Sequence, residues 1–199
     1  MINQPTLFSS ALTEDRLNVI SRLLLDARYS ALCDANTELD GAYTKGCLSF
    51  GRQRQIIINT WQNKQYHWLG MAHPGTDLIF KIGNVSVRFF TDNSNHPKKL
   101  RVLIPTQAEQ LSIFDEDPSE VVLWRFIVEP ARNDDDEDSV FFIGINNSDE
   151  IICRWKYGND PFAVLHSIDN STPPPKDLKS ALVLPKTEND ISRQVEDDV

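Results

Sequence analysis

The sequence predicts an α+β fold, with two N-terminal helices packed on a mainly antiparallel sheet of about six strands and an extended acidic C-terminal tail. Two patterns lead to this prediction. Early in the chain, apolar residues recur every three or four positions, which indicates amphipathic helices, and from Tyr66 onward they recur every second position, which indicates strands. The 199 residues, 40% hydrophobic and 25% charged, suit a single main core.

The first helix is expected from Thr13 to Leu32, because Leu17, Ile20 and Leu24 stand at helical spacing. Thr13 is the expected N-cap residue. The two acids that follow it suit the positive end of the helix dipole.

A second helix is expected to begin near Ser49 and to continue through about Trp61, with Ile57 and Trp61 four residues apart. The glycine-containing stretch Tyr43–Arg54 introduces it. Because three β-branched isoleucines in a row, 56–58, also favour extended backbone, a strand at this place is an open alternative.

The rest of the fold is expected to be an antiparallel meander of strands joined by short links, with the helices on one face. Gly83-Asn84 predicts a tight two-residue hairpin turn, and Asn146–Asp149 predicts the turn before the last strand. The expected strands are Asp77–Ile82, Val85–Phe90, Leu100–Ile104, Val121–Val128, Val140–Ile145 and Ile151–Tyr157.

One α+β domain is expected over residues 1–170, followed by a Pro-rich, mobile tail over 171–199. No apolar run reaches the ~20 residues of a membrane span, and the N-terminus shows no secretory signal pattern. The expected location is therefore the cytoplasm, where Cys33, Cys47 and Cys153 are expected to be reduced thiols.

The net charge of −9 hides a polarity along the chain. Between Gly41 and Arg101 there are nine basic residues and two acids, whereas from Val102 onward there are eight basic residues and 21 acids. A basic block is typical of an anion-binding face, and an acidic block of a partner-facing or self-shielding segment. The alternative is that folding mixes the two blocks in space.

The stretch Tyr43–Arg54 is the first candidate for binding an anion or a nucleic-acid phosphate. Its glycines allow close backbone approach, and a helix that starts near Ser49 points free N–H groups outward. Basic side chains there and on the following strands add positive charge. The candidate anion-binding residues are Lys45, Gly46, Gly51, Arg52, Arg54, Lys81 and Arg88. The alternative is an ordinary loop with solvated arginines.

The sequence contains no motif for a bound cofactor or a familiar catalytic centre. The nucleophile elbow GxSxG, the phosphate loop GxxxxGK[ST] and the dinucleotide turn GxGxxG are all absent. The histidines lack the spacing of metal ligands; they are His67, His73, His96 and His166. We therefore expect no cofactor and no metal, and favour a protein that is not an enzyme.

A metal-dependent nuclease is the enzymatic alternative. Asp77 stands at the start of an expected strand, and a site there requires a distant acid such as Asp92 or Glu38. The acidic run Asp134–Asp138 lacks the ligand spacing of a calcium loop and predicts a solvated loop between two strands.

Aromatic residues near the basic block are candidates for stacking on nucleic-acid bases, although a place in the core is the commoner role. They are Tyr66, Trp68, Phe89 and Phe90. Because side chains alternate along a strand, the two adjacent phenylalanines are expected to point to opposite faces of the sheet.

The peptide Gln110-Leu111-Ser112-Ile113-Phe114 resembles the pentapeptide by which many bacterial DNA-processing proteins dock on the replicative sliding clamp. In that motif, Gln leads, Leu follows and a hydrophobic-aromatic pair ends the peptide. The resemblance implies that Gln110 sets the register, while Leu111, Ile113 and Phe114 occupy apolar pockets of the clamp. It covers five residues, and the alternative is that these side chains cover one end of the sheet.

Together, these features predict a non-enzymatic binding or regulatory protein that acts on nucleic acid or on a nucleic-acid-processing partner, such as a sliding clamp. A metal-dependent nuclease is the first alternative. A module that binds a small ligand or a protein is the second. No membrane association is expected.

Overall fold

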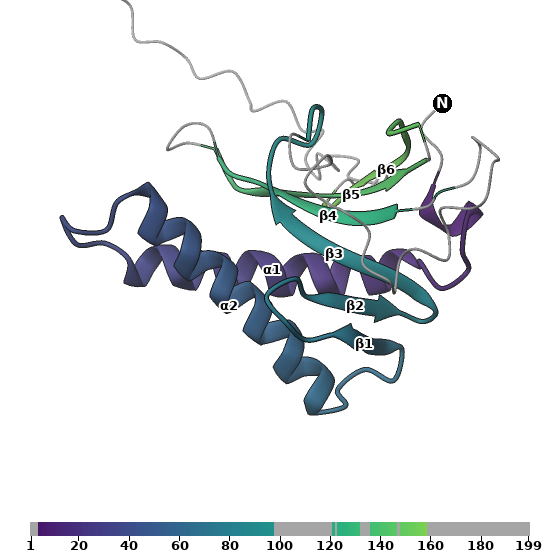
Figure 1. Cartoon of the computed structure of the whole chain (residues 1–199), viewed down its shortest axis with the longest axis horizontal. Helices are drawn as coiled ribbons and strands as arrows, with labels where there is room; N and C mark the ends of the chain where they lie inside the picture. The colour runs from purple at the N-terminus through teal and green to yellow at the C-terminus, as the bar shows by residue number, and fades with distance from the viewer. Residues whose placement is uncertain (1–3, 98–120, 122, 132–135, 147, 159–199) are drawn as a thin grey trace, which may run out of the picture. The chain divides into compact units, whose positions relative to one another are not determined.

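In the computed structural model, two helices cover one face of a six-stranded sheet (Figure 1). They are α1 (Glu14–Asp34) and α2 (Ala42–Gln62), and the short 3-10 helix η1 (Pro5–Leu7) precedes them. The structure describes residues 4–97, 121, 123–131, 136–146 and 148–158. Within this part of the chain, the predicted α+β class with two N-terminal helices is confirmed, and neither helix is apolar enough to cross a membrane.

The first predicted helix is confirmed as α1, and Leu17, Ile20 and Leu24 are buried in it. Thr13 stands at the N-cap position, where its carbonyl oxygen accepts a hydrogen bond from Leu17 N at 3.1 Å. Its side chain makes no capping hydrogen bond. The periodicity alone therefore located this helix.

The predicted start of the second helix near Ser49 is wrong, because α2 already begins at Ala42. Gly46 and Gly51 consequently lie inside the helix and not in a loop. A Cβ atom at either glycine meets nothing within 4 Å, so both face open surface, where each weakens a helix by about 1 kcal/mol without breaking it. The strand alternative is excluded. Trp61, 37% exposed, does not share the burial of Ile57.

The strands follow one another in the sheet in sequence order. They are β1 (Leu69–His73), β2 (Ile79–Ile82), β3 (Val85–Thr91), β4 (Leu123–Glu129), β5 (Ser139–Ile145) and β6 (Ile151–Lys156). The Gly83-Asn84 hairpin is confirmed: Ile82 is the partner of Val85, and Gly83 has φ of +63°. The expected strand Leu100–Ile104 and the expected boundary at residue 170 lie outside the described residues.

One pair of strands departs from the predicted meander: β3 and β4 are parallel, whereas the other neighbours are antiparallel. The link between Thr91 and Leu123 is much longer than a hairpin turn. It therefore has the length to return the chain to the starting end of β3, which parallel pairing requires.

The main core lies between the helices and the sheet. Phe80, Phe126 and Phe142, all without exposed surface, pack there: the rings of Phe80 and Phe126 are stacked with centroids 6.3 Å apart, and those of Phe126 and Phe142 are tilted with centroids 4.6 Å apart. Phe89 joins them and contacts Phe50 of α2 at 5.4 Å. Phe90 points to the other side of the sheet, as the alternation predicted.

We call the side of the sheet that is turned away from the helices the second face. A smaller apolar cluster lies on it, built around Ile127, Ile143 and Ile145. The loop after β3 crosses this face, because Ser94 and Asn95 contact side chains of β4 and β6. Figure 1 shows this loop rising on the side of the sheet away from α1.

Candidate functional site

The strand register brings three arginines into one row across the second face. Arg88 of β3 is the direct partner of Arg125 of β4, Arg125 is the partner of Ile143, and Ile143 is the partner of Arg154 of β6. We call Arg88, Arg125 and Arg154 the arginine row. Since neighbouring strands are ~4.8 Å apart, the first two arginines lie side by side with like charge.

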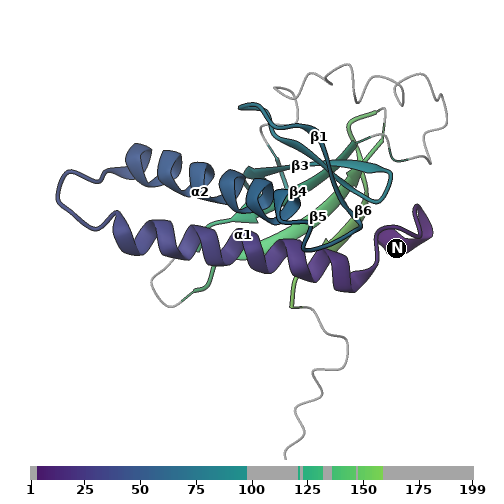
Figure 2. The same cartoon turned by 90° about the horizontal axis from the view of Figure 1, so that it is seen from below.

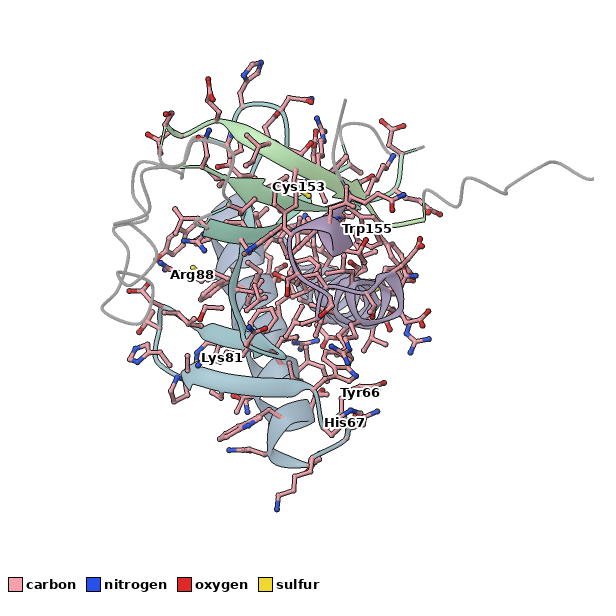
Figure 3. All side chains as sticks on the ribbon, turned by 90° about the vertical axis from the view of Figure 1, so that its right-hand side faces the viewer. Tyr66, His67, Lys81, Arg88, Cys153 and Trp155 are labelled. Atoms are coloured by element: carbon pink, nitrogen blue, oxygen red, sulfur yellow. The ribbon has the colours of Figure 1, made fainter. Side chains whose placement is uncertain are left out.

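Arg88 and Arg125 are 6% and 0% exposed. Arg88 forms an ion pair with Asp77, with Nη2 and Oδ1 3.2 Å apart, and its guanidinium lies over the ring of Phe90 at 5.2 Å. Arg125 donates from Nη1 to the carbonyl oxygen of Trp124 at 2.8 Å. Figure 3 shows Arg88 on the opposite side of the sheet from Trp155, which lies on the helix side.

Arg154, at the far end of the row, anchors the loop after β3. It donates to Asn95 Oδ1 at 2.6 Å and to Ser94 Oγ at 2.7 Å, and the Ser94 hydroxyl donates to Glu129 Oε2 at 2.7 Å. Its guanidinium lies 4.6 Å from the ring centroid of Phe141. The middle of the second face is closed to solvent, because Arg125, Ile143 and Ile145 have no exposed surface. Lys81 and Lys156 mark its more accessible margins.

The predicted anion-binding residues divide between two places. Lys45, Arg52 and Arg54 lie on α2, while Lys81 and Arg88 lie on the second face. Arg52 pairs with Asp34 and Ser30 of α1, and Arg54 donates to the carbonyl oxygens of Pro74 and Gly75. These two arginines serve contacts within the chain, and the helix start that was expected to point N–H groups outward is not near them.

A second candidate surface is the end of the α1–α2 hairpin, which extends past the strands in Figure 2. Tyr29 is 72% exposed, Leu39 91% and Tyr43 85%. We call Tyr29–Cys47, the segment that carries these three side chains, the hairpin tip. Large apolar side chains with so much exposed surface are candidates for contact with another protein.

The loop at the hairpin tip has a defined turn. Asp40 Oδ2 accepts hydrogen bonds from Thr37 Oγ1 at 2.7 Å and from Thr37 N at 3.0 Å. Hydrogen bonds from the Thr37 hydroxyl and amide, together with nearby Lys45, hold the pKa of Asp40 below its usual value. Arg52 joins α2 to α1 beside this loop through Asp34 and Ser30.

The acids of the nuclease alternative do not form a metal site within the described part of the chain. Asp77 and Asp92 flank the open end of the β2–β3 hairpin, Asp77 pairs with Arg88, and Glu38 stands in the loop between the helices. Among the described residues, no group of three or more His, Cys, Asp and Glu side chains is arranged to hold a metal ion.

Part of the acidic run 134–138 lies outside the described residues, but Asp138 has a structural contact. Its Oδ2 accepts a hydrogen bond from Arg28 Nε of α1 at 2.6 Å, and its Oδ1 accepts one from Ala131 N at 2.8 Å. This acid therefore ties the β4–β5 link to the helix layer.

The aromatic residues proposed for base stacking largely contact one another or the core. Tyr66 stacks on Trp68 at 5.1 Å, and Arg16 lies over the ring of Trp68 at 5.6 Å. A hollow of about 300 Å³ beside β6 is lined by apolar Leu12, Leu17 and Trp155 with charged residues around them. It is the closest match to the small-ligand alternative.

The clamp-like peptide Gln110–Phe114 lies outside the described residues, as do Lys98 and Lys99. Comparison with protein-family models, with curated proteins and with solved structures found no match for this chain.

Sequence reasoning missed Arg125, Arg154 and Lys156 on the second face. The signal was present in the alternation of β4, where Trp124, Phe126 and Val128 form the apolar side and place Arg125 on the other side. It also missed Tyr29, Leu39 and Tyr43. Tyr29 lies inside the predicted first helix, and Leu39 and Tyr43 lie in the stretch that was expected to be a link before the second helix.

Proposed function

We propose that this chain is a non-enzymatic binding protein that docks on a partner protein through the hairpin tip. The observation that supports the proposal is the exposure of Leu39, Tyr43 and Tyr29 at one end of a helical hairpin that extends past the sheet. Tyrosine and large aliphatic side chains bury much area at low entropic cost, which makes them effective contact residues.

The form of the tip supports this role. The Thr37–Asp40 turn and the Arg52–Asp34 ion pair hold the loop and the two helices together in the free protein. A surface that is already ordered loses less conformational entropy when it binds. These contacts restrain the loop that carries Leu39.

The charges beside Leu39 indicate the chemistry of the partner. Glu38 and Asp40 flank it, so a complementary surface has an apolar pocket with basic residues at its rim. Proteins that process nucleic acids commonly have basic surfaces, which agrees with the partner class predicted from the sequence.

The test compares Leu39→Ser/Tyr43→Ser with Leu7→Ser, because Leu7 is also exposed, at 75%, and lies outside the tip. Each variant is used to capture proteins from an extract of the source cells, and any captured protein is purified for calorimetric titration. We expect the tip variant to lose at least tenfold in affinity with an unchanged melting temperature, while Leu7→Ser binds like wild type. Equal binding by the two variants contradicts the proposal.

Nucleic acid is the second candidate ligand, favoured by the cations on the second face. Lys81 lies on β2, and Arg154 and Lys156 lie on β6, four strands further along the sheet. A ligand that reaches all three side chains therefore spans roughly 19 Å. This span suits a polyanion better than a small anion. Fluorescence anisotropy with single- and double-stranded oligonucleotides at several salt concentrations tests it. Up to three phosphate contacts predict a log–log slope of about −2 to −3.

Lys45→Ala/Lys64→Ala is the matched control for Lys81→Ala/Lys156→Ala, because its two lysines lie on or beside α2 and not on the second face. Under the nucleic-acid hypothesis, Lys81→Ala/Lys156→Ala makes oligonucleotide affinity less dependent on salt concentration, and Lys45→Ala/Lys64→Ala does not. Absence of binding at low salt removes this candidate.

A further inference from the structure

Strand β6 is an edge strand among the described residues, because β5 is its neighbour on one side and no described strand follows on the other. Tyr157 N donates to the carbonyl oxygen of Val140 at 2.9 Å. Because hydrogen-bonding groups alternate in direction along an antiparallel ladder, the backbone groups of Arg154 and Lys156 therefore point away from β5. Within the described part of the chain, these outward groups have no backbone partner.

A hollow of about 300 Å³ lies along this outer edge. Three consecutive residues of β6, 154–156, line it, although successive side chains of a strand point to opposite faces. The hollow therefore reaches the edge of the strand itself. Leu12 and Leu17 give it an apolar wall, and Gln4–Thr6 border it on the side of η1.

A second hollow, of about 590 Å³, adjoins the first, because Glu14 lines both. Trp155 lines the smaller hollow and Tyr157 the larger one, and both rings pack on the helix side of the sheet. These two residues are two positions apart, which is the repeat at which side chains of an extended strand point to one face. The two hollows therefore match successive same-face side chains of a peptide laid along β6.

The charge on the second face indicates the chemistry of such a peptide. Arg154 and Lys156 carry their cationic groups over the ring of Phe141, at 4.6 Å and 5.6 Å, and Lys156 is exposed. A strand added beside β6 brings its side chains on this face next to two positive charges, which favours acidic residues. A second copy of this chain that paired through β6 would bring the same cations together, which is unfavourable.

We propose that the outer edge of β6 is a docking site for an extended peptide of a partner protein, which adds to the sheet as a further strand. Apolar residues of the peptide enter the two hollows, and acidic residues between them lie beside Arg154 and Lys156. Backbone hydrogen bonds to β6 give affinity, and the alternating side chains give specificity. The site adjoins the first half of α1, whereas the hairpin tip begins at Tyr29, so the two docking roles are independent.

The first test titrates the full chain with a labelled eight-residue peptide in which glutamate alternates with leucine, followed by fluorescence anisotropy. We expect saturable binding, about tenfold tighter than that of the same peptide with lysine in place of glutamate. N-methylation of the glutamates and N-methylation of the leucines remove amide donors from opposite edges of the peptide. One of these two changes should abolish binding and the other should not, because one edge faces β6. Equal effects of both changes overturn the proposal.

The second test changes the site. Lys156→Glu should weaken the glutamate peptide roughly fivefold and strengthen the lysine peptide, whereas Lys45→Glu, the same change of charge on α2, should affect neither. Thr6→Phe fills the smaller hollow without truncating a core side chain, because Thr6 is exposed at its border. We expect it to lose binding at an unchanged melting temperature, while Thr6→Ser binds like wild type. Binding that survives both Lys156→Glu and Thr6→Phe places the peptide elsewhere and overturns the proposal.

The third test identifies any other occupant of the edge. Hydrogen exchange measured by NMR on the unmodified protein should be fast at the amides of Arg154 and Lys156 and should slow when the glutamate peptide is added. Slow exchange at both amides without peptide means that this chain or a second copy already pairs with β6, and it overturns the proposal. Equal affinity for the glutamate and lysine peptides also overturns it.

Discussion

Replacing Arg28 is expected to destabilise the protein substantially, because its ion pair with Asp138 is largely buried. The side chains are 10% and 19% exposed, and Nε and Oδ2 are 2.6 Å apart. Removing one partner of a fully buried pair costs 3–5 kcal/mol. Asp138 is partly solvated and keeps its hydrogen bond from Ala131 N, so we expect ~2–3 kcal/mol for Arg28→Met.

The assay is urea unfolding at neutral pH for Arg28→Met, Asp138→Asn and the double variant. The double-mutant cycle should give a coupling of about 1–2 kcal/mol. Arg52→Met is the control, since its pair with Asp34 is 34% and 62% exposed and should contribute at most ~1 kcal/mol. If Arg28→Met costs no more than Arg52→Met, or if the two single changes simply add, the pair does not join the helix layer to the β4–β5 link as argued.

Three further predictions concern single features of the fold. Burial raises the pKa of Cys153 to about 12, whereas Cys33 and Cys47 are exposed. A thiol reagent at pH 8 should therefore react with two thiols in the native protein and with three in denaturant. Rapid reaction of three thiols in the native protein contradicts the described burial. Gly83→Ala should cost ~1–3 kcal/mol in thermal unfolding, because φ is +63° and the new Cβ comes within 2.7 Å of Ala11 Cβ; an unchanged melting temperature contradicts this. The pKa of Asp40 is lowered in the folded protein, so the carboxylate stabilises the turn at Thr37 fully above the ordinary carboxyl pKa, and this stabilisation is lost as the pH falls through the lowered value. We expect the loss to be seen as faster amide exchange at Thr37 N. Asp40→Asn should show the faster exchange already at neutral pH.

The clamp-like peptide has a test of its own. If Leu111 and Phe114 dock on a partner, Leu111→Ala/Phe114→Ala should leave thermal stability within about 0.5 kcal/mol, as exposed substitutions do. If they cover one end of the sheet, truncating buried side chains should cost ~2–5 kcal/mol. A melt therefore separates the two interpretations before any partner is known.

The helices and strands were predictable from local patterns because each has a buried side with a regular period. α1 follows from the spacing of Leu17, Ile20 and Leu24, and the strands from alternation and turn residues. The start of α2 was misplaced because Gly46 and Gly51 favour loops, whereas on the open side of a helix they are only mildly unfavourable.

The candidate surfaces were less predictable because they depend on which distant residues become neighbours. Arg88 and Arg125 are 37 positions apart in sequence, and only the parallel register of β3 and β4 places them side by side. No local pattern announces that register. At the hairpin tip, the exposure of Tyr43 depends on how far the helices extend past the sheet.

The parallel pairing of β3 with β4 has a consequence for how the protein folds. β1–β3 with the helical hairpin, and the meander β4–β6, each consist of contacts between segments close in sequence, which form early. Joining β3 to β4 requires closure of a long loop, whose entropic cost rises with its length, so this step is expected to come last. The connection between β3 and β4 is also a suitable place to divide the chain. A fragment that ends after Pro97 and one that begins before Val121 should reassociate when mixed. The protein is thus a candidate for fragment complementation.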